Sequence, residues 1–161
     1  MLEYLDENKD SDKPFFLYMA LTALHIPLFP SKEFKGKSKI GDYGDLVMMI
    51  DDIVGRVNRK LKEIGKYDNT IVMFAADNGC AGYINMDRIN RKGHYPSYIY
   101  RGYKSHGWEG GHRIPFILLW GDRYGHVTDN SLVSLTDLYA TFADMLGYRM
   151  ADDEAEDSFS I

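Results

Sequence analysis

The sequence lacks several features that would assign it to a specialised class of protein. It has a single cysteine, Cys80, so no internal disulfide can form, and no Cys/His cluster has zinc-finger spacing. No apolar run approaches the roughly 20 residues that a membrane-spanning helix needs, and the acidic residues 1–10 do not resemble a secretory signal. The composition of the 161 residues, 45% hydrophobic and 27% charged, predicts about one globular domain.

Charge is unevenly distributed along the chain. The formal charge of −5 comes from 19 basic and 24 acidic residues, and residues 152–157 supply five of the acids. The opposite asymmetry occurs between residues 87 and 113. This segment has two acidic residues, Asp87 and Glu109, and six basic residues: Arg88, Arg91, Lys92, Arg101, Lys104 and Arg113. This local positive field suits an anionic ligand, although basic side chains scattered on a solvated loop give the same pattern.

Apolar patterning predicts an α/β protein. Helical spacing of apolar residues predicts a helix over about residues 43–64 that Gly65 ends, and a second helix with Ser134 as N-cap and Asp137 as its partner that Gly147 ends. Short apolar runs bounded by turn residues predict strands over residues 15–20, 70–76 and 115–120. Strand, helix and strand in succession favour a βαβ unit with parallel strands.

The predicted sheet is incomplete. Three strands fall below the usual four to six, and residues 77–113 have no sustained periodicity. We interpret the chain as part of a larger sheet. Its exposed strand edges favour self-association, because unpaired edges offer hydrogen-bonding groups to a second chain.

Asp77 and Asn78 directly follow the strand predicted over residues 70–76. They therefore stand at the carboxyl end of a strand, where α/β folds gather ligands. A carboxylate beside an amide oxygen suits Ca²⁺ or Mg²⁺, whereas Asn78-Gly79 is also a strong turn signal. Both interpretations remain open on these residues alone.

Two further residues could act on a substrate. His25 follows the first predicted strand and is expected at the same sheet edge as Asp77, where it could donate a proton or act as a structural hydrogen-bonding group. Lys104 lies among glycines and could place a point charge on a phosphate or sulfate, or simply belong to a glycine turn. Cys80 could be a nucleophile, but no partner base is evident nearby, which favours a small semi-buried hydrophobic residue.

Five ordered blocks of the sequence resemble the arylsulfatase-like sulfatases of the alkaline phosphatase superfamily. They extend over nearly the whole chain: PFFLYMALTALHIPLFP, YGDLVMMIDDIVGRV, DNTIVMFAADNG, YRGYKSHGWEGGHRIPFILLW and SLTDLYATFADMLG. The resemblance implies a three-layer sandwich of the sulfatase/alkaline-phosphatase type with a mainly parallel sheet. Residues 1–151 are then a partial catalytic domain, and residues 152–161 an acidic tail leading to a further subdomain.

The resemblance also implies roles for individual residues. Asp77 and Asn78 correspond to ligands of the active-site cation, Ca²⁺ or Mg²⁺, His25 to the histidine beside the leaving-group oxygen, and Lys104 to the lysine that holds the sulfate. His94 and Arg101 are further candidates for substrate binding. Leu24 stands where the family commonly has proline.

One family feature has no counterpart in these residues. Members carry a Cys-x-Pro/Ala-Ser-Arg-type segment whose cysteine or serine becomes formylglycine, the nucleophile, together with an aspartate pair that completes the metal shell. The segment around Cys80 does not match it. The resemblance thus implies a sulfatase fragment that is inactive alone.

The expected ligand is an aryl or carbohydrate sulfate ester, with no nucleic-acid or membrane partner and with a periplasmic or secreted parent protein. Two alternatives remain open at this point. One is a phosphate or phosphonate hydrolase of the same superfamily, and the other is a non-catalytic sulfate-binding module.

Overall fold

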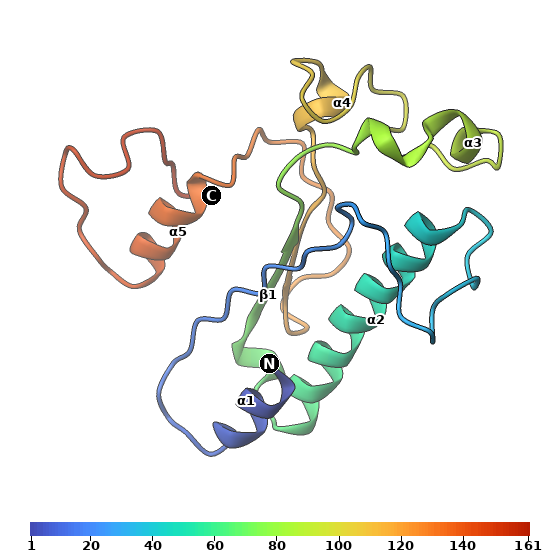
Figure 1. Ribbon diagram of the computed structural model, residues 1–161. Helices are drawn as coiled ribbons and strands as arrows, with labels where there is room; N and C mark the ends of the chain where they lie inside the picture. Colours follow the sequence, from blue (N-terminus) through green and yellow to red (C-terminus); the bar gives the residue numbers. More distant parts are fainter. The chain divides into compact units, whose positions relative to one another are not determined.

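The computed structural model describes residues 1–161, which divide into two compact units, residues 1–125 and 126–161. No helix is both long and apolar enough to cross a membrane. The second unit contains one helix, α5 (Asp137–Met145). The first unit contains, in chain order, α1 (Leu2–Glu7), α2 (Asp42–Glu63), the 3₁₀ turn η1 (Tyr67–Asn69), β1 (Ile71–Ala75), the 3₁₀ turn η2 (Gly82–Ile84), α3 (Met86–Asn90), α4 (Glu109–His112) and β2 (Phe116–Trp120) (Figure 1).

Helix α2 confirms the helix predicted over residues 43–64. Its apolar stripe buries Leu46 and Leu61, and Leu5 of α1 is buried in the same unit. Gly65 ends it as predicted, with φ of +68°. The N–H of Lys66 donates to the carbonyl of Leu61 at 2.9 Å, the bond that satisfies a carbonyl left open by the last helical turn.

A buried carboxylate anchors the loop before α2. Asp45 is fully buried, and it accepts hydrogen bonds from the backbone N–H groups of Gly36 at 2.7 Å and Ser38 at 2.6 Å. Burial by itself would raise the pKa of Asp45, but these donors and the nearby Lys35 charge hold it below its usual value. The charged carboxylate therefore fixes residues 36–41 onto the start of α2.

Replacing Asp45 by asparagine is expected to lower the free energy of unfolding by about 2 kcal/mol at pH 7, because an amide cannot accept both hydrogen bonds. Because the folded pKa of Asp45 is depressed, its contribution is present above the unfolded pKa and is lost as pH falls through the folded pKa. Urea unfolding of the chain at pH 7 and pH 3 measures both effects. Asp42→Asn, at an exposed ion pair with Lys35, is the matched control and should cost less than about 1 kcal/mol.

The sheet consists of β1 and β2 alone, and they are antiparallel, with Ile71 opposite Trp120 and Ala75 opposite Phe116. The mixed helix-and-sheet class and the incomplete sheet are confirmed, as is the pairing of the second and third predicted strands. The parallel pair predicted between residues 15–20 and 70–76 does not form, and β1 pairs antiparallel with β2 instead. A parallel pair needs a long crossover, usually a helix, that carries the chain back to the start of the first strand. No such helix lies between β1 and β2, so the chain can return beside β1 in the opposite direction.

The first predicted strand, residues 15–20, is not a strand in the structure. Phe16 and Tyr18 are 73% and 84% exposed, while Phe15 and Leu17 between them are half-buried. This alternation is typical of an extended chain with one face covered. The segment has no sheet neighbour with which to form a ladder, and an apolar run alone cannot supply that partner.

Helix α5 of the second unit confirms the predicted closing helix, and Gly147 ends it at a φ of +65°. The helix begins later than predicted, at Asp137 with Thr136 as the cap residue. Ser134 still pairs with Asp137, since its N–H donates to the Asp137 carboxylate at 2.7 Å. Residues 152–161 pack back on α5, where the Ser158 hydroxyl accepts the N–H of Ala140 at 2.8 Å. A domain boundary near residue 151 stays a prediction.

Candidate functional site

The antiparallel register places the candidate site. Because Ala75 pairs with Phe116, the loop that leaves β1 runs beside the segment that enters β2, which includes α4. The N–H of Gly79 donates to the carbonyl of Gly111 at 2.8 Å. Asp77 and Asn78 are therefore held against α4 by backbone contacts.

Three glycines allow these segments to meet. A Cβ on Gly79 would overlap the carbonyl oxygen of Gly110 and lie 2.8 Å from its carbonyl carbon. A Cβ on Gly110 would overlap the carbonyl oxygen of Gly102, and one on Gly111 that of His106. The loop after β1, the loop over residues 101–106 and α4 thus pack backbone against backbone, an approach that only glycine permits.

Lys104 belongs to this glycine-packed cluster. Its backbone N–H donates to the carbonyl of Cys80 at 2.8 Å, and the N–H of Gly110 donates to the carbonyl of Arg101 at 2.8 Å. These two bonds attach the loop over residues 101–106 to the loop after β1 and to α4. The half-buried Lys104 has no carboxylate within ion-pair distance, so its ammonium group is available to an anion.

Asp77 and Asn78 have the geometry of two open oxygen ligands. The Nδ2 group of Asn78 donates to the carbonyl of Gly79 at 3.1 Å, which leaves the amide oxygen without a protein donor. Asp77 is exposed and has no ion pair. Hard oxygens of this kind fit Ca²⁺ or Mg²⁺, but Ca²⁺ takes six to eight ligands. No cluster of three or more His, Cys, Asp or Glu side chains is present, so the chain fits a cation only in part.

His25 lies beside the segment that follows β1. Its ring contacts that of Tyr83 edge-on, with centroids 5.7 Å apart, and its Nδ1 lies 2.9 Å from the carbonyl oxygen of Ile26. Tyr83 follows Asp77 by six residues, and the expectation that both loops open at one sheet edge stays a prediction. The proton-donating role of His25 stays a prediction.

The two further candidates lie on the same basic segment. Arg101 is exposed, and its guanidinium stacks over the ring of Trp108 at 4.0 Å. His94 is half-buried, with its ring centroid 6.0 Å from that of Tyr43. Their roles in substrate binding also stay predictions.

Tyr43 is a residue that the sequence did not single out. It stands in the first turn of α2, and its hydroxyl lies 3.9 Å from the sulfur of Cys80. Burial raises the pKa of both the Tyr43 hydroxyl and the Cys80 thiol. The thiol is therefore protonated near neutral pH, which supports the expectation that Cys80 is not a nucleophile. The only sequence signal for Tyr43 was its place at the head of the amphipathic helix.

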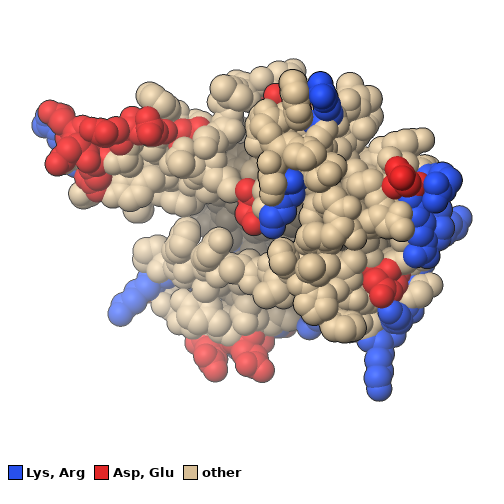
Figure 2. Space-filling view, turned by 45° about the horizontal axis from the view of Figure 1, so that its top comes forward, with Lys and Arg blue, Asp and Glu red and all other residues tan.

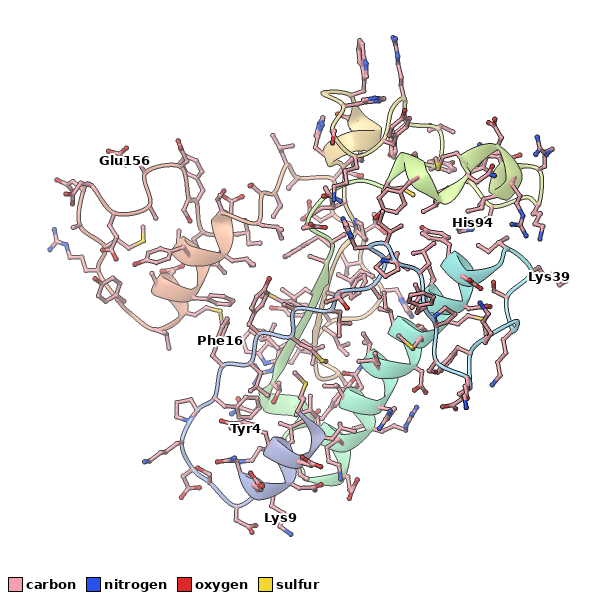
Figure 3. All side chains as sticks on the ribbon, in the orientation of Figure 1. Tyr4, Lys9, Phe16, Lys39, His94 and Glu156 are labelled. Carbon is pink, nitrogen blue, oxygen red and sulfur yellow. The ribbon has the colours of Figure 1, made fainter.

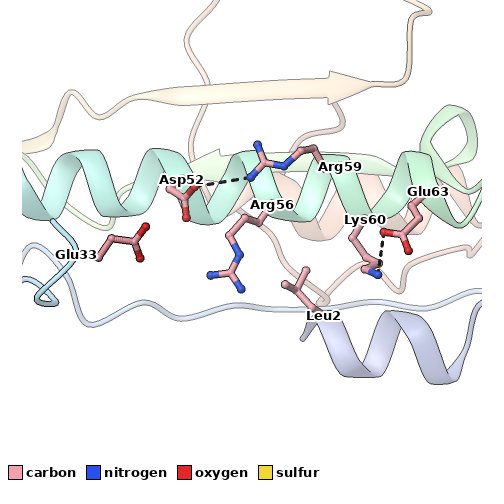
Figure 4. A pocket seen from close by; sticks show the side chains of 7 residues that line it. All are labelled: Leu2, Glu33, Asp52, Arg56, Arg59, Lys60 and Glu63. Carbon is pink, nitrogen blue, oxygen red and sulfur yellow. Dashed lines mark ion pairs between the residues drawn. The ribbon is translucent and has the colours of Figure 1, made fainter.

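A hollow of about 530 Å³ lies along α2, and no residue of the glycine-packed cluster lines it (Figure 4). Three basic and three acidic side chains line it, together with Leu2: Glu33, Asp52, Arg56, Arg59, Lys60 and Glu63. Arg59 pairs with Asp52 at 3.7 Å and Lys60 with Glu63 at 2.9 Å. Because its charges balance and partly pair, the hollow has no preference for an ion of either sign.

Known proteins resemble this chain in family, in sequence and in structure. A family model described as Sulfatase matches residues 1–148. The chain is 37% identical over 150 residues to an N-acetylgalactosamine-6-O-sulfatase of Bacteroides thetaiotaomicron, covering 91% of this chain and 29% of that protein. It is 36% identical over 160 residues to an arylsulfatase of Hemicentrotus pulcherrimus, covering 99% of this chain and 28% of that protein.

Solved structures give the same likeness. One, from work on the metabolism of multiple glycosaminoglycans by Bacteroides thetaiotaomicron, superposes with a TM-score of 0.88 at 34% identity over 99% of this chain and 33% of that one. Another, a protein called Ps i-CgsB in complex with a neocarrahexaose, gives a TM-score of 0.76 at 28% identity over 98% of this chain and 35% of that one. The chain thus spans about a third or less of these relatives.

Proposed function

The chain belongs to the sulfatase family, and on this premise we propose that it is part of an enzyme that hydrolyses sulfate esters with a divalent cation and a formylglycine nucleophile. The observation that carries the proposal is the glycine-packed cluster. It brings the Asp77–Asn78 pair and Lys104 onto adjoining backbone segments. Oxygen ligands beside an unpaired ammonium group suit an anion that binds together with a cation.

Asp77 and Asn78 would hold the cation, Ca²⁺ or Mg²⁺, through the carboxylate and the open amide oxygen. When bound, the cation neutralises charge that develops on the non-bridging sulfate oxygens. The remaining ligands would come from outside these residues, since no group of three or more His, Cys, Asp or Glu side chains is placed to hold a metal ion.

Lys104 would hold the sulfate as a point charge, and its place is fixed through the backbone bond to Cys80. His25, next to Tyr83, would donate a proton to the departing oxygen. Arg101 and His94 would contact the part of the substrate beyond the sulfate. All four side chains are exposed or half-buried, so a substrate can reach the charge or the proton that each role requires.

The nucleophile is not among these 161 residues, since no Cys-x-Pro/Ala-Ser-Arg segment occurs and the Cys80 thiol is kept protonated. The groups present can bind a sulfate ester but cannot attack its sulfur. We therefore expect the isolated chain to bind a sulfate ester and not to hydrolyse it.

A turnover assay with an aryl sulfate and Ca²⁺ tests the proposal. The complete enzyme, which joins this chain to the nucleophile segment, should hydrolyse the ester, and the isolated chain should stay at background. Calorimetric titration of the chain with Ca²⁺ should give millimolar or weaker affinity, because most ligands are lacking. Two results would contradict the proposal. One is hydrolysis by the isolated chain that is lost in the Cys80→Ser variant. The other is a complete enzyme that cleaves phosphate esters but not sulfate esters.

A further inference from the structure

A basic surface lies next to the candidate site. The loop before α2 and the segment around α3 contribute five exposed cations, which we call the basic rim: Lys37, Lys39, Arg88, Arg91 and Lys92. On the face drawn in Figure 2, lysine and arginine side chains gather at the side where Figure 1 draws this loop and α3. The rim therefore combines segments about 50 residues apart in the sequence.

The fold holds the two halves of the rim together. The ammonium group of Lys92 donates to the carbonyl of Lys39 at 2.5 Å, and the guanidinium of Arg88 lies over Gly41. None of the five rim residues forms an ion pair. Asp42, the acid of the adjoining helix turn, is paired with Lys35 at 2.6 Å. Asp87 of α3 is also exposed, so the five cations of the rim outnumber the nearby acids and leave a net positive charge.

A groove of about 270 Å³ with a mixed polar and apolar lining borders the rim. Four aliphatic side chains line it together with four other residues: Leu28, Ile40, Ile84 and Ile89, and Gly41, Asp42, Tyr43 and Arg88. Alternating cationic and apolar contacts of this kind suit a chain of sugar rings, which present both charged substituents and apolar ring faces. Single-stranded nucleic acids are bound instead on several exposed aromatic rings, whereas the groove has one aromatic side chain, the half-buried Tyr43.

Tyr43 connects the rim to the candidate site. Its hydroxyl contacts Cys80, three residues after Asp77, and its ring contacts His94, two residues after Lys92. Figure 3 shows His94 between α3 and the start of α2, with Lys39 farther out on the loop. Tyr43 therefore contacts one residue near the candidate site and one residue near the rim. A polymer bound on the rim would pass close to the candidate site.

We propose that the basic rim and the groove beside it form a docking surface for a sulfated glycan chain, separate from the groups that hold the reacting sulfate. The inference rests on the proposed function for the nature of the polymer, and on charge complementarity for the binding itself. The rim holds sulfate groups that are not being hydrolysed, and it thereby retains the polymer beside the site.

Binding of fluorescently labelled chondroitin 6-sulfate to the chain tests the inference. The triple variant Lys39→Gln, Arg88→Gln, Arg91→Gln should weaken binding about tenfold or more at low salt and make its salt dependence shallower, because three cations are lost. The matched control Lys9→Gln, Lys13→Gln, Arg149→Gln removes the same charge from exposed positions elsewhere. It should change the dissociation constant less than about twofold.

The outcomes separate this inference from the proposed function. Equal binding by the triple variant and the control overturns the docking surface, as does duplex DNA or an anionic vesicle that binds the rim more tightly than the glycan. In the complete enzyme, the triple variant should lose efficiency on the polymeric ester and keep full activity on a small aryl sulfate. A complete enzyme with no sulfatase activity would refute the proposed function, while rim-dependent glycan binding by the chain would still stand.

Discussion

Replacing Lys104 by alanine in the complete enzyme is expected to lower kcat/KM for an aryl sulfate by about 100- to 1,000-fold, the usual cost of removing one group that stabilises developing negative charge. The loop that carries Lys104 is fixed by backbone bonds at Cys80 and Gly110, so truncation removes the ammonium group and leaves its support in place. Steady-state kinetics at saturating Ca²⁺ measure the effect.

Arg113 provides the control for this substitution. It lies in the same basic segment, but its guanidinium is already paired with Glu109 at 3.0 Å and stacked over Tyr100. Arg113→Ala should therefore change kcat/KM less than about threefold. Lys104→Arg, which keeps the charge, should recover part of the activity. If Lys104→Ala is no more harmful than Arg113→Ala, the sulfate-holding role of Lys104 is wrong.

Replacing Gly79 by alanine is expected to destabilise the chain by about 3 kcal/mol or more. The new methyl group would overlap the carbonyl oxygen of Gly110, and backbone atoms of two segments cannot move aside as a flexible side chain can. The same shift would break the bond from the Gly79 N–H to the Gly111 carbonyl. Urea unfolding of the 161-residue chain measures the loss.

Gly107→Ala is the matched control, since nothing lies within 4 Å of a Cβ there and its φ is not in the left-handed region. It should be neutral, or slightly stabilising because alanine restricts the unfolded chain. Equal stability of the two alanine variants would mean that the glycine-packed cluster tolerates side chains and does not position Asp77 and Lys104.

Local signals in the sequence determined the main helices and their ends. The 3.6-residue spacing of apolar positions from Leu46 to Leu61 and the glycines at 65 and 147 specified α2 and the ends of both long helices, because they act within a few residues of one another. The blocks around Asp77 and Lys104 also indicated the family, which the comparisons confirm. Motifs of contiguous residues do not need a tertiary structure to be recognised.

Only the tertiary structure decided what these segments contact. An apolar run predicts burial but not a partner, so residues 15–20 join no sheet, and the partner of β1 is the antiparallel β2. Likewise, glycines at 79, 110 and 111 are ordinary turn residues until the register brings their backbones together. The link through Tyr43 and the joining of Lys39 to Lys92 depend on contacts between residues far apart in the chain, which no local pattern encodes.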